Sequence, residues 1–302
     1  MPLANDGAAE RQYLDLIQEI LERGVHRDDR TGVGTYSIHG ATMRFDLSEG
    51  HLPVLTTKKT GWKLAVKEML WFLSGESSIR PLLAAGVHIW SDWPHQNYVQ
   101  ATGDAISMEA FEKRVLEDDA FAGQWGDLGP VYGTQWRRWK GHDGREHDQL
   151  AKLVEQIKIN PNSRRLLFHG WNVADVDEMA LPPCHLLYQY FVANGRLSCS
   201  LYQRSVDVGL GLPFNIIGAS VLLRMLAQQC GLEPGELFWV GHDVHIYSNH
   251  SEHLALQRSR EPRPFPKLIL KRRPPSLFEY EIEDFALEGY APHPAIAMSV
   301  AV

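Results

Sequence analysis

LPPCHLLYQYFVANGRLSCSLYQRSVDVGLGLPFN, residues 181–215, is the stretch that decides the fold, because it predicts two strands joined by a tight turn. Asn194 and Gly195 separate two runs rich in Leu, Tyr, Phe and Val. Both central positions of a type I′ turn need a positive φ, which Asn and Gly tolerate. We therefore expect a two-residue hairpin in which Ala193 faces Arg196.

The turn also sets which residues of the two strands lie opposite one another. Counting back from it places Cys184 opposite Ser205, with Arg204 one position away, and neighbours along a strand point to opposite faces of a sheet. Either Ser205 faces the cysteine or a one-residue bulge turns Arg204 toward it, and we favour the bulge. A guanidinium beside Cys184 would favour the thiolate, which is the nucleophilic form. The same alternation points Cys184 and His185 apart, which argues against a Cys–His hydrolase pair.

Length, composition and charge limit the classes of protein to which this chain can belong. It has 302 residues, 44% of them apolar, which is enough for one large domain or two small ones with a packed core. A net charge of -7 argues against a general nucleic-acid binder, so an anion site would need scattered arginines that converge in the fold. The apolar stretches are shorter than a membrane span, and the first residues show no signal pattern. We expect a soluble, cytoplasmic protein that binds neither membranes nor DNA.

The cysteines and histidines give no metal signature. Cys184, Cys199 and Cys230 lack metal-ligand spacing, and for Cys199 and Cys230 we expect buried apolar roles. Cys184 differs because two prolines hold it at the mouth of a strand, where chemistry is often exposed. His245 and Tyr247 lie two positions apart on one face of a predicted strand, where hydrogen bonding is commoner than metal binding. We expect no metal.

Hydrophobic periodicity and glycines place the other elements. Helices are expected at 11–23, 61–73, 77–85, 107–121, 147–159 and 216–230, with Gly24 as a left-handed cap of the first and Gly231 capping the last. Strands are expected after the glycine loop at 31–34, in LLFHGW, in GHDVHIYSNH and in the tail segment YEIEDFALEGY. The strands are mostly hairpin-connected and the helices cluster beside them, so the class is α+β. Residues 94–125 are predicted to be a surface insertion in a single domain of residues 1–302.

Four polar or aromatic residues have both a structural and a functional interpretation. Glu68 lies inside an apolar helical run, where a carboxylate is rare without a partner or a task, and we favour a functional role over an ion pair. Trp90 and Trp93 are either core residues or walls of a pocket for a flat ring. Tyr132 is either a core tyrosine or an active-site hydroxyl.

The motifs along the chain resemble those of the folate-dependent thymidylate synthases. These motifs are DRTG-x-GT, E-x-LWFL, GDLGPVYG-x-QWR, SRR, LPPCH, YQRS-x-D, GLPFN, HIYSNH and the ending VAV. The resemblance extends from about Tyr13 to Val302 and follows the order of the family. It implies a large mixed β-sheet with bulged strands flanked by helices, with one face of the sheet buried in a homodimer.

The resemblance also implies a reaction. The family makes dTMP from dUMP, takes both carbon and hydride from 5,10-methylenetetrahydrofolate, and releases dihydrofolate. The pyrimidine C5 is a poor nucleophile, and a thiolate added at C6 turns the ring into an enolate that can attack. Cys184 resembles that nucleophile, and Arg204 would lower its pKa and contact the phosphate. Glu68 resembles the acid/base that works through water near O4 and the departing folate nitrogen, and Tyr132 resembles a member of the water network that removes the C5 proton.

By the same resemblance, several residues would bind dUMP. Asn215 would read the uracil edge, because an amide can donate to O4 and accept from N3–H. His245 and Tyr247 would bond the 3′-hydroxyl. The phosphate would be held by Arg30, Arg204 and Ser205 of one subunit and by Arg164 and Arg165 of the other subunit of a homodimer, with Asp207 also beside the nucleotide.

The folate site is implied in the same way. Asp207 would face the pterin, and Val302 with its carboxylate would close the site against water. The remaining residues that resemble folate contacts are Lys58, near the glutamate, and Ile89, Trp90, Trp93, Leu210, Gly211 and Phe214 as apolar walls.

The chain departs from the family pattern beside the folate pocket. Gly209 replaces a bulky aromatic residue, and Ile217-Gly218 change the start of the following helix. The shape of that pocket is therefore the part that the sequence leaves open.

The reaction implied by the resemblance has two alternatives. One is a dUMP 5-hydroxymethylase, in which water rather than hydride quenches the intermediate. The other is a non-catalytic nucleotide- or RNA-binding relative, including one that binds its own mRNA.

Overall fold

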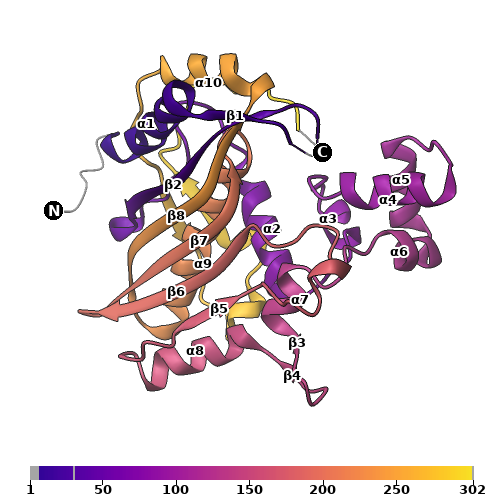
Figure 1. Cartoon of the computed structure of the whole chain (residues 1–302). Coiled ribbons are helices and arrows are strands. Elements are labelled where there is room, and N and C mark those ends of the chain that lie inside the picture. Colours follow the sequence, from indigo (N-terminus) through magenta and orange to yellow (C-terminus); the bar gives the residue numbers. More distant parts are fainter. Residues whose placement is uncertain (1–6, 30, 301–302) are drawn as a thin grey trace. The chain divides into compact units, whose positions relative to one another are not determined.

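The structure, a computed structural model, describes residues 7–29 and 31–300 (Figure 1). The chain forms two compact units. The first contains the described residues up to Val66, residues Leu153–Phe168, and the described residues from Cys184 onward. The second contains Lys67–Lys152 and His169–Pro183.

A six-stranded mixed sheet is the centre of the first unit. Its strand order is β1-β2-β8-β7-β6-β5. Strands β7 and β8 run parallel, whereas the pairs β1/β2, β2/β8 and β6/β7 are antiparallel. The bounds are β1 Val25–Arg27, β2 Thr35–Asp46, β5 Leu167–His169, β6 His185–Ala193, β7 Arg196–Asp207 and β8 Glu233–Tyr247. The predicted α+β class with a large mixed sheet is confirmed.

The turn between β6 and β7 has the predicted geometry. Asn194 has φ 51° and Gly195 has φ 72°. Ala193 pairs with Arg196. The expected two-residue hairpin is therefore confirmed, and with it the register from which the position of Cys184 is counted.

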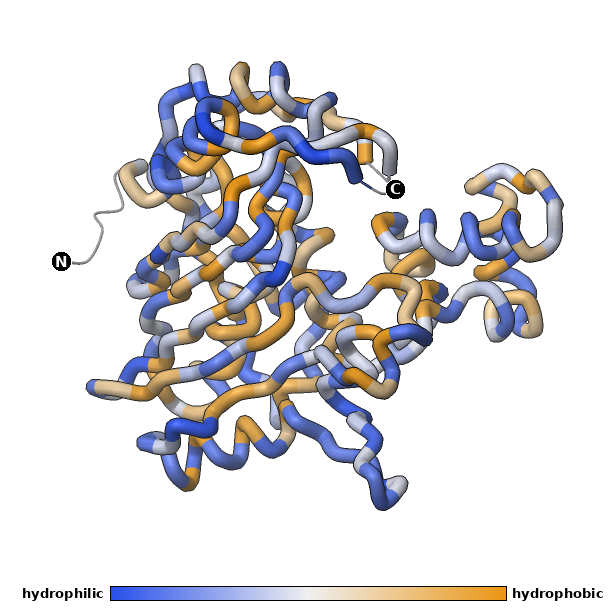
Figure 2. The backbone as a smooth tube through the Cα atoms, in the orientation of Figure 1, coloured by the Kyte–Doolittle hydropathy of each residue, from blue (hydrophilic) through white to orange (hydrophobic). Residues whose placement is uncertain are grey.

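One face of the sheet is buried by α9 (Gly211–Cys230), which packs against β7 and β8. On β7 the inward residues Leu197, Leu201 and Gln203 are buried and alternate with half-buried neighbours. Figure 2 shows hydrophobic and hydrophilic positions along the strands of the first unit. Helix α9 is long and apolar enough to cross a membrane by length and composition, yet most of it is buried inside the fold, so it is a core helix. It ends at Gly231 with φ 68°, as predicted.

Helix α1 (Ala8–Arg23) contacts β2 and α10 (Ser251–Arg258). The prediction that Gly24 is a left-handed cap is wrong, because its φ is -62°. The glycine is needed for a different reason: a Cβ there would lie 2.3 Å from the backbone oxygen of Ile20. Close approach, and not a positive φ, excludes a side chain at this helix end.

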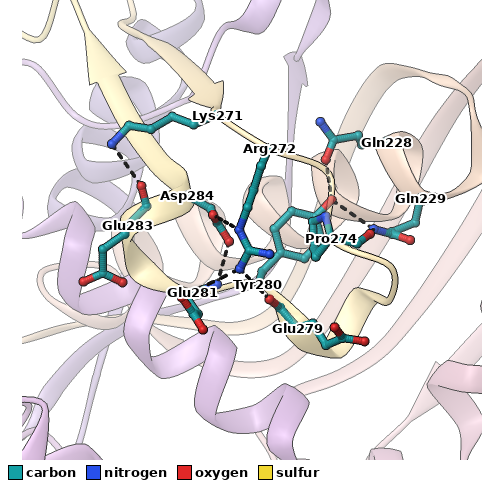
Figure 3. Close-up of polar contacts among 10 residues, drawn as sticks. All are labelled: Gln228, Gln229, Lys271, Arg272, Pro274, Glu279, Tyr280, Glu281, Glu283 and Asp284. Atoms are coloured by element: carbon teal, nitrogen blue, oxygen red, sulfur yellow. Dashed lines mark hydrogen bonds and ion pairs between the residues drawn. The ribbon is translucent and has the colours of Figure 1, made fainter.

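The C-terminal part of this unit is fastened to the end of α9, as Figure 3 shows. Strands β9 (Lys267–Leu270) and β10 (Phe285–Glu288) form an antiparallel pair, so the predicted tail strand begins only at Phe285. Arg272 bonds the Asp284 carboxylate, and the Tyr280 hydroxyl donates to Gln228 on α9. The short 3-10 helices of this unit are η1 Ser48–Gly50, η3 Ser248–His250, η4 Leu277–Glu279 and η5 Ile282–Asp284.

The second unit is mainly helical. Its elements are most of α2 (Trp62–Ser74), α3 Arg80–Ala84, α4 Asp92–Thr102, α5 Met108–Glu117, α6 Asp119–Trp125, α7 Tyr132–Arg137, the short strands β3 Trp139–Lys140 and β4 Glu146–His147, the start of α8 (Gln149–Ile159) and η2 Val176–Glu178. The predicted single helix at 107–121 is wrong, because it breaks at Asp118. That residue is extended, and its side chain caps α6 by accepting from the N–H of Phe121 (3.0 Å).

Candidate active site

The predicted bulge is present and brings an arginine to Cys184. The register between β6 and β7 shifts between His185 and Leu187, so that His185 pairs with Gln203. The backbone N–H of Arg204 donates to the oxygen of Cys184 (3.0 Å), and its guanidinium Nη2 lies 3.6 Å from the Cys184 sulfur. Cys184 is half-buried. The arrangement in which Arg204 and not Ser205 faces the cysteine is confirmed.

The histidine beside Cys184 serves the core. His185 is buried, and its Nδ1 lies 3.0 Å from the Tyr188 hydroxyl. Burial lowers the pKa of His185 to about 3, so the ring stays neutral and is a poor proton acceptor. Cys199 is also buried, and burial raises the pKa of its thiol to about 12. The expectation that Cys199 is a core residue is confirmed.

The parallel pairing of β7 and β8 brings further predicted residues together. Asp207 pairs with His245, and Ser205 pairs with Asp243. The rings of His245 and Tyr247 are 5.4 Å apart, edge to face. The Nδ1 of His245 lies 3.4 Å from Asp243, whose pKa is lowered mainly by the hydrogen bond from His245. Asp243, which also pairs with Arg27 at 2.8 Å, orients the imidazole and was not predicted from the sequence.

A chain of amides fixes the orientation of Asn215. The indole N–H of Trp239 donates to Gln203 Oε1 (2.6 Å), and Gln203 Nε2 donates to Asn215 Oδ1 (2.9 Å). An indole can only donate, so it determines which end of each amide is oxygen. Sequence reasoning missed Gln203, which is fully buried. The signal was available: Gln203 is a polar residue in the inward-facing series of β7 that otherwise carries Leu197, Cys199 and Leu201.

Asp207 lies at the centre of a second polar cluster. Its carboxylate accepts from the N–H groups of Gly209 (2.8 Å) and Leu210 (3.0 Å), and it lies 3.8 Å from the Nδ1 of His250. Burial alone would raise the pKa of Asp207, but His250 and the Gly209 N–H outweigh it and hold the pKa below the ordinary value. The pKa of His250 is raised in turn, since Asp207 and the oxygen of Ser299 outweigh the effect of burial.

Lys58 and Gly209 belong to the same cluster. Lys58 is buried, its Nζ donates to the oxygen of Gly209 (2.5 Å), and burial lowers its pKa to about 8. A Cβ on Gly209 would lie 2.8 Å from His250 Nδ1 and 3.3 Å from the sulfur of Met298. Glycine is therefore needed here to let His250 and the chain near Met298 pack. Leu210, which donates to Asp207, is the N-cap of α9, and Gly211 and Phe214 lie in the first turn of that helix.

In the second unit, Glu68 is brought together with three aromatic residues. Its Oε1 accepts from the indole N–H of Trp90 (2.8 Å). Burial raises the pKa of Glu68 to about 7, and the bond from Trp90 opposes this shift only in part. The ring of Trp90 lies 5.2 Å from that of Trp93 and 5.9 Å from that of Tyr132, while Ile89 is partly exposed. A half-buried carboxyl with a pKa near neutrality is suited to proton transfer.

The remaining predicted residues are placed as follows. Arg164 and Arg165 are exposed, and Arg164 lines a cavity of about 470 Å³ together with Gln189, Phe191 and Ser200. Arg30 and Val302 lie outside the described residues. Within residues 7–29 and 31–300, no group of three His, Cys, Asp or Glu side chains could hold a metal ion.

Comparison with known proteins identifies the class. The family model described as thymidylate synthase matches residues 11–302. The thymidylate synthase of Cereibacter sphaeroides is 61% identical over 294 residues, covering 97% of this chain and 99% of that protein. The thymidylate synthase of Zymomonas mobilis is 59% identical over 295 residues, covering 97% and 100%. The chain therefore belongs to the thymidylate synthase family, and the enzyme class and function expected from its motifs, a methyltransferase of dTMP biosynthesis, are confirmed.

Proposed function

We propose that the chain methylates dUMP reductively to dTMP through a covalent adduct between Cys184 and C6 of the pyrimidine. The observation that carries this proposal is the 3.6 Å contact between Arg204 Nη2 and the sulfur of Cys184. A cation at this distance favours the thiolate. The sulfur adds to C6, and the electron pair moves through C5 to O4. When bound, 5,10-methylenetetrahydrofolate supplies the one-carbon unit and then the hydride, and it leaves as dihydrofolate.

Asn215 selects the base in this proposal. Because Trp239 and Gln203 direct Asn215 Oδ1 toward Gln203, the Nδ2 group is left to donate to O4 of uracil. The second lone pair of Oδ1 can accept from N3–H. Cytosine presents an amino donor at the O4 position and an acceptor at N3, so the same orientation disfavours it.

The phosphate is held by cations that no single subunit supplies. We assign Arg30, Arg204 and Ser205 to it, together with Arg164 and Arg165 of the partner subunit, because a dianion is best held by several guanidinium forks. The dimer is formed through the uncovered face of the sheet, on which Phe191 is 67% exposed. Sedimentation of the purified chain as a monomer would remove this part of the proposal.

His245 and Tyr247 bond the 3′-hydroxyl, with Asp243 orienting the imidazole.

Glu68 is the proposed proton carrier, and its pKa of about 7 supports this role. It acts through water on O4 and on the departing folate nitrogen, and Tyr132 belongs to the water network that removes the C5 proton. For the folate we assign Asp207 to the pterin, because its lowered pKa keeps the carboxylate charged. Lys58, Ile89, Trp90, Trp93, Leu210, Gly211, Phe214 and Val302 complete the proposed folate contacts.

Two measurements test the proposal. Wild-type protein with dUMP and methylenetetrahydrofolate should show the rise in absorbance of dihydrofolate, and turnover of dUMP without that rise would indicate a 5-hydroxymethylase instead. Cys184→Ala should abolish turnover while dUMP binding stays within about tenfold, since the sulfur acts in the reaction more than in binding. Cys199→Ala is the matched control and should remain active. Activity in Cys184→Ala would exclude the covalent mechanism.

Asn215→Asp tests the reading of the base. A protonated aspartate can accept from the amino group of cytosine and donate to its N3, so the variant should shift preference from dUMP toward dCMP. The measurement is the ratio of kcat/KM for the two nucleotides. An unchanged ratio would show that Asn215 does not read the pyrimidine edge.

We further place the enzyme in the cytoplasm.

A further inference from the structure

The turn at His88–Ser91 carries two residues of the proposed folate site. The backbone N–H of Ser91 donates to the oxygen of His88 (3.1 Å), which closes the turn and puts Ile89 and Trp90 at its central positions. Trp90 is buried, and its indole N–H donates to Glu68. The position of this turn therefore sets both the indole ring and the hydrogen bond that tunes Glu68.

One carboxylate from the insertion holds both ends of that turn. Glu112, on α5, accepts from the hydroxyl of Ser91 through Oε1 (2.6 Å). Its other oxygen, Oε2, lies 2.9 Å from Nδ1 of His88. The side chain of Glu112 is only 14% exposed and Ser91 is buried. Because the two oxygens of one rigid group engage the first and last residues of the turn, they restrict its rotation as well as its position.

The helix that carries Glu112 is itself fixed. The hydroxyl of Ser107 caps α5 by accepting from the N–H of Ala110 (3.2 Å), and Phe111 and Val115 are buried on its inner side. The guanidinium of Arg80 donates to the oxygen of Leu116 near the end of the helix (2.6 Å). Glu112, whose two contacts to His88 and Ser91 we call the clamp, is therefore carried by a helix whose position is fixed by packing and hydrogen bonds, as precise positioning requires.

We propose that Glu112 is a positioning residue for the reaction, which holds the turn at His88–Ser91 so that Trp90 presents its ring to the folate and its N–H to Glu68. This inference rests on the proposed function for Trp90 and Glu68. It also gives the insertion at 94–125 a role, since a residue of the insertion acts on the reaction through the turn. Two titratable groups act with Glu112: His88, which contacts it, and Asp92. Burial raises the pKa of Asp92, while His95 opposes this shift and Glu112 adds to it.

The first test measures the pKa of Glu68 without any substrate. Protein labelled with 13C at the glutamate carboxyl carbon is titrated, and the Glu68 signal is assigned as the one lost in Glu68→Gln. In Glu112→Ala the indole is free to move away, and the pKa of Glu68 should rise by about half a unit or more, since the bond from Trp90 normally lowers it. In a Trp90→Phe background, Glu112→Ala should add no further shift, because the effect is transmitted through the indole.

The second test separates positioning from stability. Glu112→Ala should raise the KM for methylenetetrahydrofolate about tenfold and leave that for dUMP within about twofold. The control is Asp119→Ala, which removes another acidic residue of the insertion, one that pairs with Arg80 and not with the turn. It should leave both KM values and the pKa of Glu68 unchanged.

Several outcomes would overturn the proposal that Glu112 positions the turn at His88–Ser91. A Glu68 titration that is the same in wild type, Glu112→Ala and Asp119→Ala would do so, as would a shift that adds to that of Trp90→Phe. An equal rise of both KM values, together with a lower melting temperature, would show a merely structural contact. If the wild type forms no dihydrofolate, the proposed function fails, and the titration still decides whether Glu112 acts on Glu68 through Trp90.

Discussion

Glu10 and Glu68 are two glutamates that the fold shields from water, Glu10 fully and Glu68 in part, and their surroundings differ. Glu10 on α1 is fully buried and accepts four hydrogen bonds, two from Thr56 and two from Thr57, at 2.5–2.9 Å. For Glu68 on α2, the donor found among residues 7–29 and 31–300 is the indole of Trp90. A buried carboxylate is costly unless hydrogen bonds replace water. The comparison separates a carboxylate that fastens the backbone from one that can exchange its proton.

Removing Glu10 should have the largest effect, and it should be an effect on stability. In Glu10→Ala, two backbone N–H groups and two hydroxyls lose a buried partner, and the free energy of unfolding should fall by about 4 kcal/mol. The measurement is urea unfolding followed by circular dichroism. Glu19→Ala is the control, since Glu19 is an exposed residue of the same helix that forms an i,i+4 pair with Arg23. A loss below about 1 kcal/mol for Glu10→Ala would contradict the role as a fastening group.

Removing the charge of Glu68 should act on the rate instead. Glu68→Gln keeps the shape and can still accept from Trp90, but it cannot deliver a proton, so kcat should fall about a hundredfold. The measurement is dihydrofolate formation, together with circular dichroism to show an unchanged fold. A kcat within about threefold of wild type would show that the proton comes from another group.

The same substitution should stabilise the fold at high pH. The pKa of Glu68 is about 7 in the folded chain, above its ordinary value of 4.5. The folded state therefore holds this proton more tightly, and the stability present below pH about 4.5 is lost as the pH rises through about 7. Glutamine carries no charge, so Glu68→Gln should gain roughly 2 kcal/mol over wild type at pH 8 and almost nothing at pH 4. Unfolding curves at the two pH values check the difference, and a gain that is independent of pH would refute this account.

The smallest effect is expected when the indole N–H that Trp90 donates to Glu68 is removed. Trp90→Phe keeps the aromatic ring and removes the N–H that lowers the pKa of Glu68, so the midpoint of the kcat–pH profile should rise by about half a unit. Trp125→Phe changes an indole of the insertion that packs against the ring of Tyr98, and it should leave the midpoint in place. A midpoint that falls in Trp90→Phe would mean that the indole stabilises the neutral acid.

Local chemistry explains which features could be predicted from the sequence. Asn194-Gly195 fixes a turn by itself, and counting from it gives the register of the first strand pairs. Counting alone places Cys184 opposite Ser205, and the bulge was favoured because it brings the Arg204 guanidinium to the thiol. Glu68 stands out because its neighbours are apolar. Glu10 does not, because it lies in the polar start of a helix, and only tertiary contacts bring it to Thr56 and Thr57.

The features that the sequence did not reveal depend on distant partners. At Gly24 a close backbone approach has the same sequence signal as a left-handed cap. At Asp118 a capping side chain breaks a helix whose apolar spacing continues. Gln203 and Asp243 act by orienting other side chains, so their roles become visible only when Asn215 and His245 are placed.

The bulge between His185 and Leu187 makes the reactive pair depend on a count of residues. Cys184 and Arg204 meet because one strand is a residue longer than its partner over this interval. A single-residue deletion or insertion between them would keep both Cys184 and Arg204 in the chain. It would nevertheless shift the register, so that Ser205 or another neighbour of Arg204 would face the sulfur. We expect this interval to tolerate substitutions far better than changes in length. The number of residues between Cys184 and Arg204 should therefore indicate an active enzyme better than their identities do.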